Sequence, residues 1–283
     1  MSKINIFAFA DEACPQIDGQ IDALVRNSLD GLEIRGVDGM NISDITAEKA
    51  KEVRSKLDAA GLSVFSIGSP IGKIGIDDDF SAHLDKFKHT LELADILGAK
   101  NMRIFSFYID GNAAQYADKV LDRMNKLVCA SRGSDITLCH ENEKGIFGDI
   151  PERCAVIHEN IPEIKAVFDP ANFVQCGVNT LDAYAKLKSY INYMHIKDSH
   201  LDGSIVPAGY GDGNIKEIVA DLIGNGKCSF TLEPHLAVFE GLSGLEREGE
   251  KSNIGAFSFR DSNTAFDAAV TAFNKIIGEQ IRK

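Results

Sequence analysis

Residues 136–141, with the sequence ITLCHE, form a short apolar run that ends in a histidine and a glutamate. Three later runs have the same character and also end close to an acid or an imidazole: IKAVFD at 164–169, NYMHIKD at 192–198 and CSFTLEP at 228–234. Their length and their β-branched and aromatic content predict strands. Because a stretch with helical spacing follows each run, we expect parallel strands joined by helices.

The same alternation reaches back to the N-terminus. Further strands are predicted at 4–10, 32–36, 62–68 and 102–107. Helices are predicted at 15–29, 46–60 and 77–97, and a long one runs from after the strand at 102–107 to about Ser131. Further helices are predicted at 151–159, 180–188, 214–224 and 261–277. This uninterrupted alternation indicates an α/β fold, a (β/α)8 TIM barrel that forms a single domain over 1–283. An open doubly wound sheet is the alternative, but no GxGxxG follows the first strand.

Composition narrows the classes of function. A chain of 283 residues suits a barrel, which typically needs about 250. The net charge of -12 argues against a nucleic-acid partner, which would require a basic face. Six scattered cysteines without a CxxC pair predict reduced thiols. Because we find neither a signal sequence nor a run of 18 apolar residues, we expect a cytoplasmic protein without a membrane partner.

The active site of a TIM barrel lies at the carboxyl ends of its strands. The four late strands deliver Glu141, Asp169, His195 and Glu233 to that rim. Each residue alone has an ordinary explanation, such as a loop ion pair or a turn. Three carboxylates at one barrel mouth would repel one another unless a cation neutralised them. Three oxygen ligands and one nitrogen suit Mn²⁺, our preferred ion, and also Mg²⁺, Co²⁺ or Zn²⁺.

The four strand ends read TLCHENE, FDPANF, MHIKDS and FTLEPHL. Over nearly the whole chain they resemble the xylose-isomerase-like TIM barrels, the sugar phosphate isomerase/epimerase family. The resemblance implies that Glu141, Asp169, His195 and Glu233 bind a divalent metal and that Glu141 and Glu233 also act as catalytic acid and base. It implies an isomerase or epimerase of a small sugar or sugar derivative. The reaction would be proton transfer next to a carbonyl through a metal-stabilised enediolate.

Two departures from the family's ketose 3-epimerases keep other reactions open. Those enzymes have a histidine where this chain has Asn172, and they lack the HENEKG sequence at 140–145. Inosose dehydratases, dehydroshikimate dehydratases and subunits of C-glycoside-cleaving enzymes look similar at the same strands. A metal-dependent dehydratase or lyase is therefore the alternative, and a non-catalytic sugar-binding subunit is a further one. Endonuclease IV shares the fold, but it has more histidines and must grip DNA, which the acidic charge opposes.

Other polar side chains around the rim are candidates for contact with the substrate. The predicted substrate-binding residues are Lys73, Arg103, Glu143, Asn172, Lys197 and His235. Glu33 and Arg35 suit either a binding surface or charge balance, and Lys197 or Asp198 could orient a ligand. The glycine-rich segment 207–215 is predicted to close over the substrate. The segment 241–260 is compatible with a lid, a dimer contact or a mobile loop, and homo-oligomerisation is left open.

Overall fold

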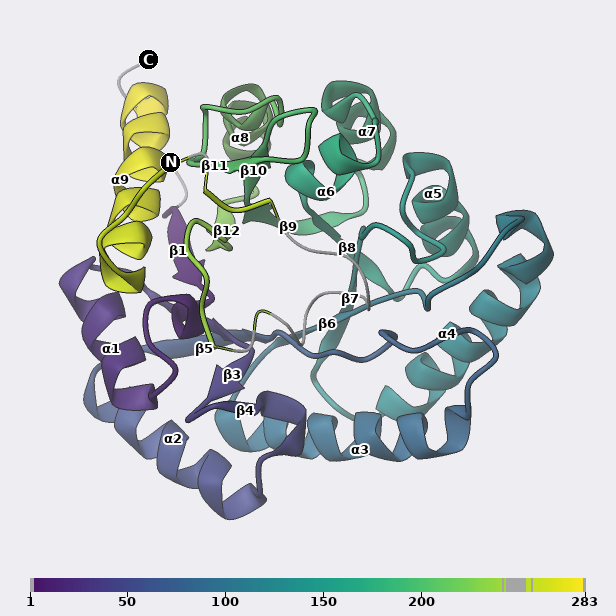
Figure 1. The fold of residues 1–283 in the computed structure, drawn as a ribbon. Coiled ribbons are helices and arrows are strands. Elements are labelled where there is room, and N and C mark those ends of the chain that lie inside the picture. The colour runs from purple at the N-terminus through teal and green to yellow at the C-terminus, as the bar shows by residue number, and fades with distance from the viewer. Residues whose placement is uncertain (1–2, 241, 243–252, 256, 282–283) are drawn as a thin grey trace.

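Eight parallel strands close into a barrel, as the sequence predicts (Figure 1). The computed structural model describes residues 3–240, 242, 253–255 and 257–281. The barrel strands are β1 (Asn5–Ala8), β2 (Gly31–Ile34), β5 (Ser63–Ile67), β6 (Asn101–Ile104), β7 (Thr137–Glu141), β8 (Lys165–Phe168), β9 (Ile191–Ile196) and β12 (Ser229–Leu232). The sheet closes because β1 pairs with both β2 and β12. The open doubly wound alternative is therefore excluded.

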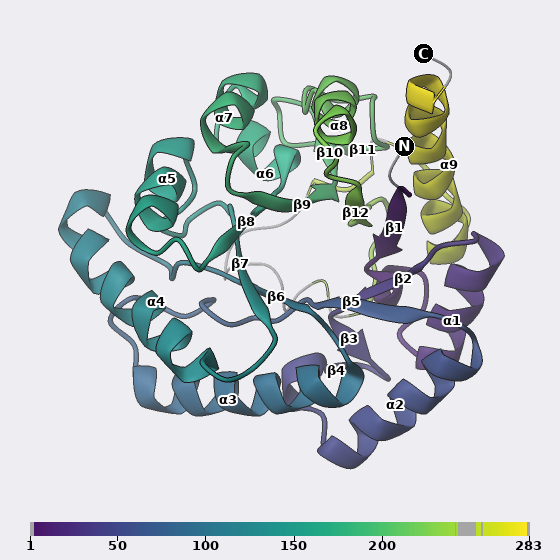
Figure 2. The ribbon, with the colours of Figure 1, turned by 180° about the vertical axis from the view of Figure 1, so that it is seen from behind.

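A ring of helices surrounds the barrel, as both views show (Figures 1 and 2). Its members are α1 (Ile17–Arg26), α2 (Ala47–Ala59), α3 (Phe80–Leu97), α4 (Ala117–Ser131), α5 (Pro151–Asn160), α7 (Thr180–Leu187), α8 (Ile215–Gly224) and α9 (Ser262–Ile281). Local sequence sets their ends: α3 starts after Asp79, whose side chain accepts the N–H of Ser81, and stops at Gly98 with φ 71°. In both views α9 lies beside β1 and completes the ring.

The rim of the barrel contains short elements that were not predicted from the sequence. The helix α6 (Pro170–Gln175) follows β8 at once, because Asp169 caps it and Pro170 starts it. Two antiparallel pairs, β3 (Gly36–Val37) with β4 (Met40–Asn41) and β10 (Asp198–Ser199) with β11 (Ile205–Val206), extend the loops after β2 and β9. Among the described residues, 3₁₀ helices lie at Ala10–Glu12, Ile42–Asp44 and Ala113–Tyr116. The predicted strand 4–10 therefore ends two residues early.

The interior of the barrel has an aromatic floor. The rings of Phe7 and Phe65 stack with centroids 4.2 Å apart, and Tyr193 meets Phe65 edge-on at 5.0 Å. Side chains two residues further along a strand point to the same face. His195 therefore stands one layer above Tyr193, toward the carboxyl ends of the strands. The polar residues of the mouth rest on an apolar base that fills the barrel.

The sequence also led to expectations for the segment 241–260 and for membrane-spanning segments. Most of the segment 241–260, weighed as a lid, dimer contact or mobile loop, lies outside the described residues. Among the helices of the described residues, none combines the length and apolar character needed to cross a membrane.

Candidate metal centre

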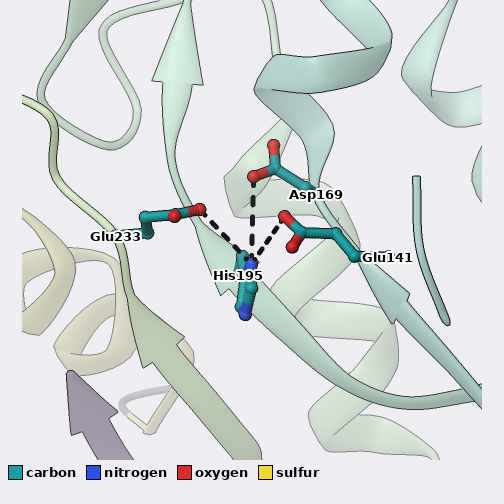
Figure 3. Close-up of side chains that lie close together, drawn as sticks. All are labelled: Glu141, Asp169, His195 and Glu233. Carbon is teal, nitrogen blue, oxygen red and sulfur yellow. Dashed lines mark hydrogen bonds and ion pairs between the residues drawn. The ribbon is translucent and has the colours of Figure 1, made fainter. Parts of the chain in front are cut away.

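The four predicted ligands come from four neighbouring strands of the barrel (Figure 3). Glu141 is the last residue of β7 and His195 the fifth of β9, while Asp169 and Glu233 directly follow β8 and β12. One potential ligand atom from each residue lies within 4.8 Å of the other three. All four residues are at most 3% exposed. The structure thus brings together, in a buried position, the side chains that the sequence placed at successive strand ends.

The imidazole of His195 faces all three carboxylates. Its Nδ1 lies 2.9 Å from Glu141 Oε1, 3.4 Å from Glu233 Oε2 and 4.0 Å from Asp169 Oδ2. Figure 3 shows Glu141 and Glu233 approaching from opposite sides, with Asp169 between them. Burial opposes a charged imidazole, but Glu141 and Glu33 outweigh it and hold the pKa of His195 well above its ordinary range. A proton and a metal ion would therefore compete for Nδ1.

Lys197 supplies a cation inside this cluster. Its Nζ lies 2.8 Å from Asp169 Oδ2 and 3.1 Å from Glu233 Oε2. Burial raises the pKa of Asp169 to about 7, although Lys197 partly opposes the rise. For Glu233, Lys197 and His195 outweigh burial and hold the pKa well below its ordinary value. The two carboxylates that share one ammonium group therefore differ in how readily they accept a proton.

Arg35 joins the first strand of the barrel to the last. Its Nε lies 2.9 Å from Asp11 Oδ2, its Nη2 3.2 Å from Glu12 Oε1 and its Nη1 3.1 Å from Glu233 Oε1. The residue is 3% exposed. Three carboxylates thus use its donors, which agrees with the charge-balance interpretation of Arg35 rather than with a free binding surface.

Arg103 approaches Glu141 as well as Glu233. Its Nη1 is 3.3 Å from Glu141 Oε2 and 3.8 Å from Glu233 Oε1. The guanidinium groups of Arg103 and Arg35 both stack on Phe9, at 5.1 and 4.4 Å from the ring centroid. The predicted substrate-binding residue Arg103 therefore contacts two candidate ligands directly.

Glu12 was not among the site residues predicted from the sequence, although it binds His235. His235 has φ 46°, and its backbone N–H donates to Glu12 Oε2 at 2.7 Å. Its Nε2 lies 3.4 Å from Glu12 Oε1 and 3.7 Å from Glu233 Oε1. Burial raises the pKa of Glu12 to about 8, although Arg35 lowers it. The signal was present in the sequence, because the first strand runs directly into Asp11 and Glu12.

The charges and donors of the mouth fit a divalent cation. The mouth combines six buried carboxyl groups with the imidazole of His195 and three permanent cations; the carboxyl groups are those of Asp11, Glu12, Glu33, Glu141, Asp169 and Glu233, and the cations are Arg35, Arg103 and Lys197. Within the described part of the chain, no hydrogen bond of good geometry reaches Glu141 Oε2 or Asp169 Oδ2, although both are buried and each has a cation nearby, Arg103 Nη1 at 3.3 Å and Lys197 Nζ at 2.8 Å. Buried oxygens of this kind are costly unless an ion or a donor satisfies them. Glu12, Glu233 and His235 form a second close group, and Arg35 contacts both of its carboxylates.

The remaining predicted substrate residues fall into two classes. Asn172, 3% exposed, donates to Asn142 O at 2.9 Å and to Glu141 Oε1 at 3.4 Å, so it holds Glu141. Lys73 and Glu143 form an ion pair at 2.8 Å, with side chains 11% and 24% exposed. This pair is therefore more accessible to a molecule that enters the mouth.

Asp198 does not contact the cluster as a ligand-orienting residue would. Its carboxylate accepts the backbone N–H groups of Gly209, Gly211 and Gly213 at 2.8, 3.0 and 2.9 Å. A charged acceptor for three amides fixes the shape of the segment 207–215. Of the two neighbouring residues considered for that role, only Lys197 contacts the candidate ligands.

Comparisons with known proteins agree with this architecture. The model of the family described as xylose isomerase-like TIM barrel matches residues 21–248, most of the chain. No curated protein matches the sequence. Many solved structures match over nearly their full lengths at low identity, and three of them are described here. An L-ribulose 3-epimerase has TM-score 0.76 and 16% identity, covering 100% of this chain and 96% of its own.

The other two differ from the first in what they are described to do or bind. A probable 3-DHS dehydratase from Bacillus anthracis has TM-score 0.73 and 14% identity, covering 96% and 99% of the two chains. The IOLI protein, solved with a zinc atom, has TM-score 0.72 and 12% identity, covering 98% and 99%. At identities this low, the structural likeness shows a shared fold and no more. The family model, in contrast, matches the amino-acid sequence over most of the chain. The chain belongs to the xylose isomerase-like TIM barrel family.

Proposed function

We propose that this chain is a divalent-metal-dependent isomerase or epimerase of a small sugar or sugar derivative. Glu141, Asp169, His195 and Glu233 would hold the ion. The observation that carries the proposal is the convergence of three carboxylates and an imidazole within 4.8 Å at a buried barrel mouth. The oxygen-rich donor set favours Mn²⁺, with Mg²⁺, Co²⁺ and Zn²⁺ also compatible.

The chemistry requires a proton to leave and return next to a carbonyl. When bound, the ion would act as a Lewis acid on the oxygens of the substrate. Glu141 and Glu233, on opposite sides of the cluster, would serve as the two proton-transfer groups (Figure 3). One of the two groups, as the carboxylate, takes the proton from the carbon, the C–H electron pair moves toward the carbonyl oxygen, and the other, which must start as the carboxylic acid, gives a proton back to carbon. Return to the opposite face of the same carbon gives an epimer, while return to the neighbouring carbon, with the hydroxyl proton passing to the former carbonyl oxygen, gives an isomer. Proton exchange with water then restores both groups.

Nearby side chains would bind and orient the substrate. Arg103 and Lys197 place positive charge beside the carboxylates, where oxygen charge develops during proton removal. Lys73 and Glu143 lie at the more exposed part of the mouth and suit hydroxyl groups of a carbohydrate. His235 is held beside Glu233 and would contact the substrate from that side.

A metal-dependent dehydratase is the second candidate. It is favoured by Asn172, whose amide binds Glu141 at a position where the related epimerases have a histidine. The likeness in fold to a probable 3-DHS dehydratase is consistent with it. Both reactions begin with removal of a proton next to a carbonyl, and they differ in whether a hydroxyl group then leaves.

Three measurements on the purified protein test these functions. Metal analysis after loading with Mn²⁺ should give about one ion per chain, whereas no uptake would contradict the proposal. Incubation with a panel of ketoses in D₂O should introduce deuterium next to the carbonyl of the true substrate. A new enone absorbance would instead identify the dehydratase. Binding of a sugar without exchange or absorbance would indicate a sugar-binding subunit.

The domain organisation, the partner and the cellular location are also proposals. We propose that residues 1–283 form one domain, that the partner is a small carbohydrate rather than nucleic acid or membrane, and that the protein acts in the cytoplasm. Homo-oligomerisation is left open, and measurement of the mass in solution would decide it.

A further inference from the structure

The second nitrogen of His195 also meets a carboxylate. Its Nε2 lies 3.0 Å from Glu33 Oε2, and both residues are 0% exposed. Glu33 belongs to β2, which is separated from β9 by β1 and β12 in the barrel order. The contact therefore crosses the barrel interior, and it reaches the side of the imidazole that faces away from Glu141, Asp169 and Glu233.

Glu33 is itself fixed on its other oxygen. Its Oε1 accepts the hydroxyl of Tyr193 at 2.8 Å and that of Ser66 at 3.2 Å. Tyr193 precedes His195 by two residues on β9, so both side chains face the interior. The register between β2 and β5 shifts after Leu32, which sets Glu33 opposite Ser66. Two hydroxyl donors and an imidazole thus hold one buried carboxylate in a single orientation.

This arrangement bears on which nitrogen of His195 carries the proton when a ligand is bound. A neutral imidazole carries one proton, and the nitrogen that donates a hydrogen bond cannot also bind an ion. When an ion takes the place of the proton on Nδ1, Glu33 is the acceptor, 3.0 Å away, for the proton that stays on Nε2. Nδ1 is the atom that faces the three carboxylates. The ring of Phe9, edge-on to His195 with centroids 5.2 Å apart, further restricts its rotation.

We propose that Glu33 is a positioning residue for the metal centre, which keeps the proton of His195 on Nε2 and so presents Nδ1 to a divalent cation. The inference rests on the metal site proposed above and adds a residue that touches none of the three carboxylate ligands in the described hydrogen bonds and ion pairs. A carboxylate behind a metal-bound histidine typically contributes 10- to 100-fold in metal affinity.

Mn²⁺ titration of the full-length protein, followed by the electron paramagnetic resonance signal of free Mn²⁺, tests this role. Glu33→Leu removes the acceptor and should weaken Mn²⁺ binding by about 10- to 100-fold. Glu33→Gln keeps an acceptor oxygen without the charge and should show a smaller loss. The matched control is Ser66→Ala, which removes a different partner of Glu33 and should leave the affinity within about threefold. Equal affinity in Glu33→Leu and the wild type would overturn the proposal.

A second measurement does not depend on how the variants fold. In wild-type protein loaded with diamagnetic Mg²⁺, the ¹⁵N spectrum of His195 should show a proton on Nε2 and none on Nδ1. A proton on Nδ1 in the loaded protein would overturn the role of Glu33 even if every variant unfolded. Failure of the wild type to bind either Mn²⁺ or Mg²⁺ would instead overturn the metal site, so the two proposals fail in different ways.

Discussion

The late and early halves of the barrel contribute different things to the same mouth. The late strands β7, β8, β9 and β12 supply the four candidate ligands and Lys197. The early strands and their loops supply Glu33, Arg35 and Arg103, which contact those ligands directly. They also supply Glu12, which contacts Arg35 and His235. In the proposed metal centre the late half would therefore bind the ion, whereas the early half would set the charge and orientation of the ligands.

The largest effect should follow from removing a ligand of the late half. Asp169→Ala deletes one oxygen donor and should lower Mn²⁺ affinity by more than the roughly 100-fold upper range for an outer partner. Proton exchange into substrate should disappear with it. Metal analysis and titration measure the change, and Asp182→Ala on the exposed face of α7 is the control. Retention of the wild-type metal content by Asp169→Ala would remove the basis of the division between the two halves.

A change in the early half should cost stability as well as function. Arg35→Met leaves Asp11, Glu12 and Glu233 without their shared cation, and loss of one partner in a buried ion pair typically costs about 3–5 kcal/mol. Urea unfolding measures this. The comparison variant is Arg54→Met, whose pair with Asp58 is about half exposed and should contribute less than about 1 kcal/mol. Similar losses in the two variants would show that the early half is not a charge-balancing frame.

The late half also contains a buried histidine that is not one of the candidate ligands, His158 on α5. Burial lowers the pKa of His158 from 6.5 to about 4. Below pH 6.5 the unfolded chain takes up a proton that the folded protein refuses, so stability falls as the pH drops from 6.5 toward 4. A shift of this size corresponds to about 3 kcal/mol.

The variant His158→Asn should therefore lose less stability between pH 7 and pH 4 than the wild type. Urea unfolding at both pH values measures the difference. His200→Asn, at a side chain that is 46% exposed, should behave as the wild type does. An equal acid loss in His158→Asn and the wild type would place the acid sensitivity elsewhere.

The smallest effect is expected at the entrance, where the two halves meet. Lys73 and Glu143 form a partly exposed ion pair, and such pairs contribute about 0–1 kcal/mol. A double-mutant cycle of Lys73→Ala and Glu143→Ala should give a coupling energy in that range. If the pair contacts substrate, KM should rise several-fold in the single variants with little change in kcat. A coupling energy above about 2 kcal/mol would mean that the entrance is as firmly organised as the interior.

Much of the fold could be predicted because its signal is repeated. The alternation of strand and helix patterns recurs along the chain, and closure into a barrel is confirmed. The short α6 was missed because its start depends on Asp169 and Pro170, which also read as a turn. For the site, the sequence placed Glu141, Asp169, His195 and Glu233 at one rim, and their role as ligands stays a prediction.

The order of the strands and the chemistry at their ends follow from the amino-acid sequence, because parallel strands with short connections bring their carboxyl ends to one face. The contacts across the barrel follow from the folded structure alone. The contact of Glu33 with His195 and the use of Arg35 by Asp11, Glu12 and Glu233 depend on strand register and closure. No local pattern encodes these, because the partners lie far apart in the chain and meet only once the barrel has closed.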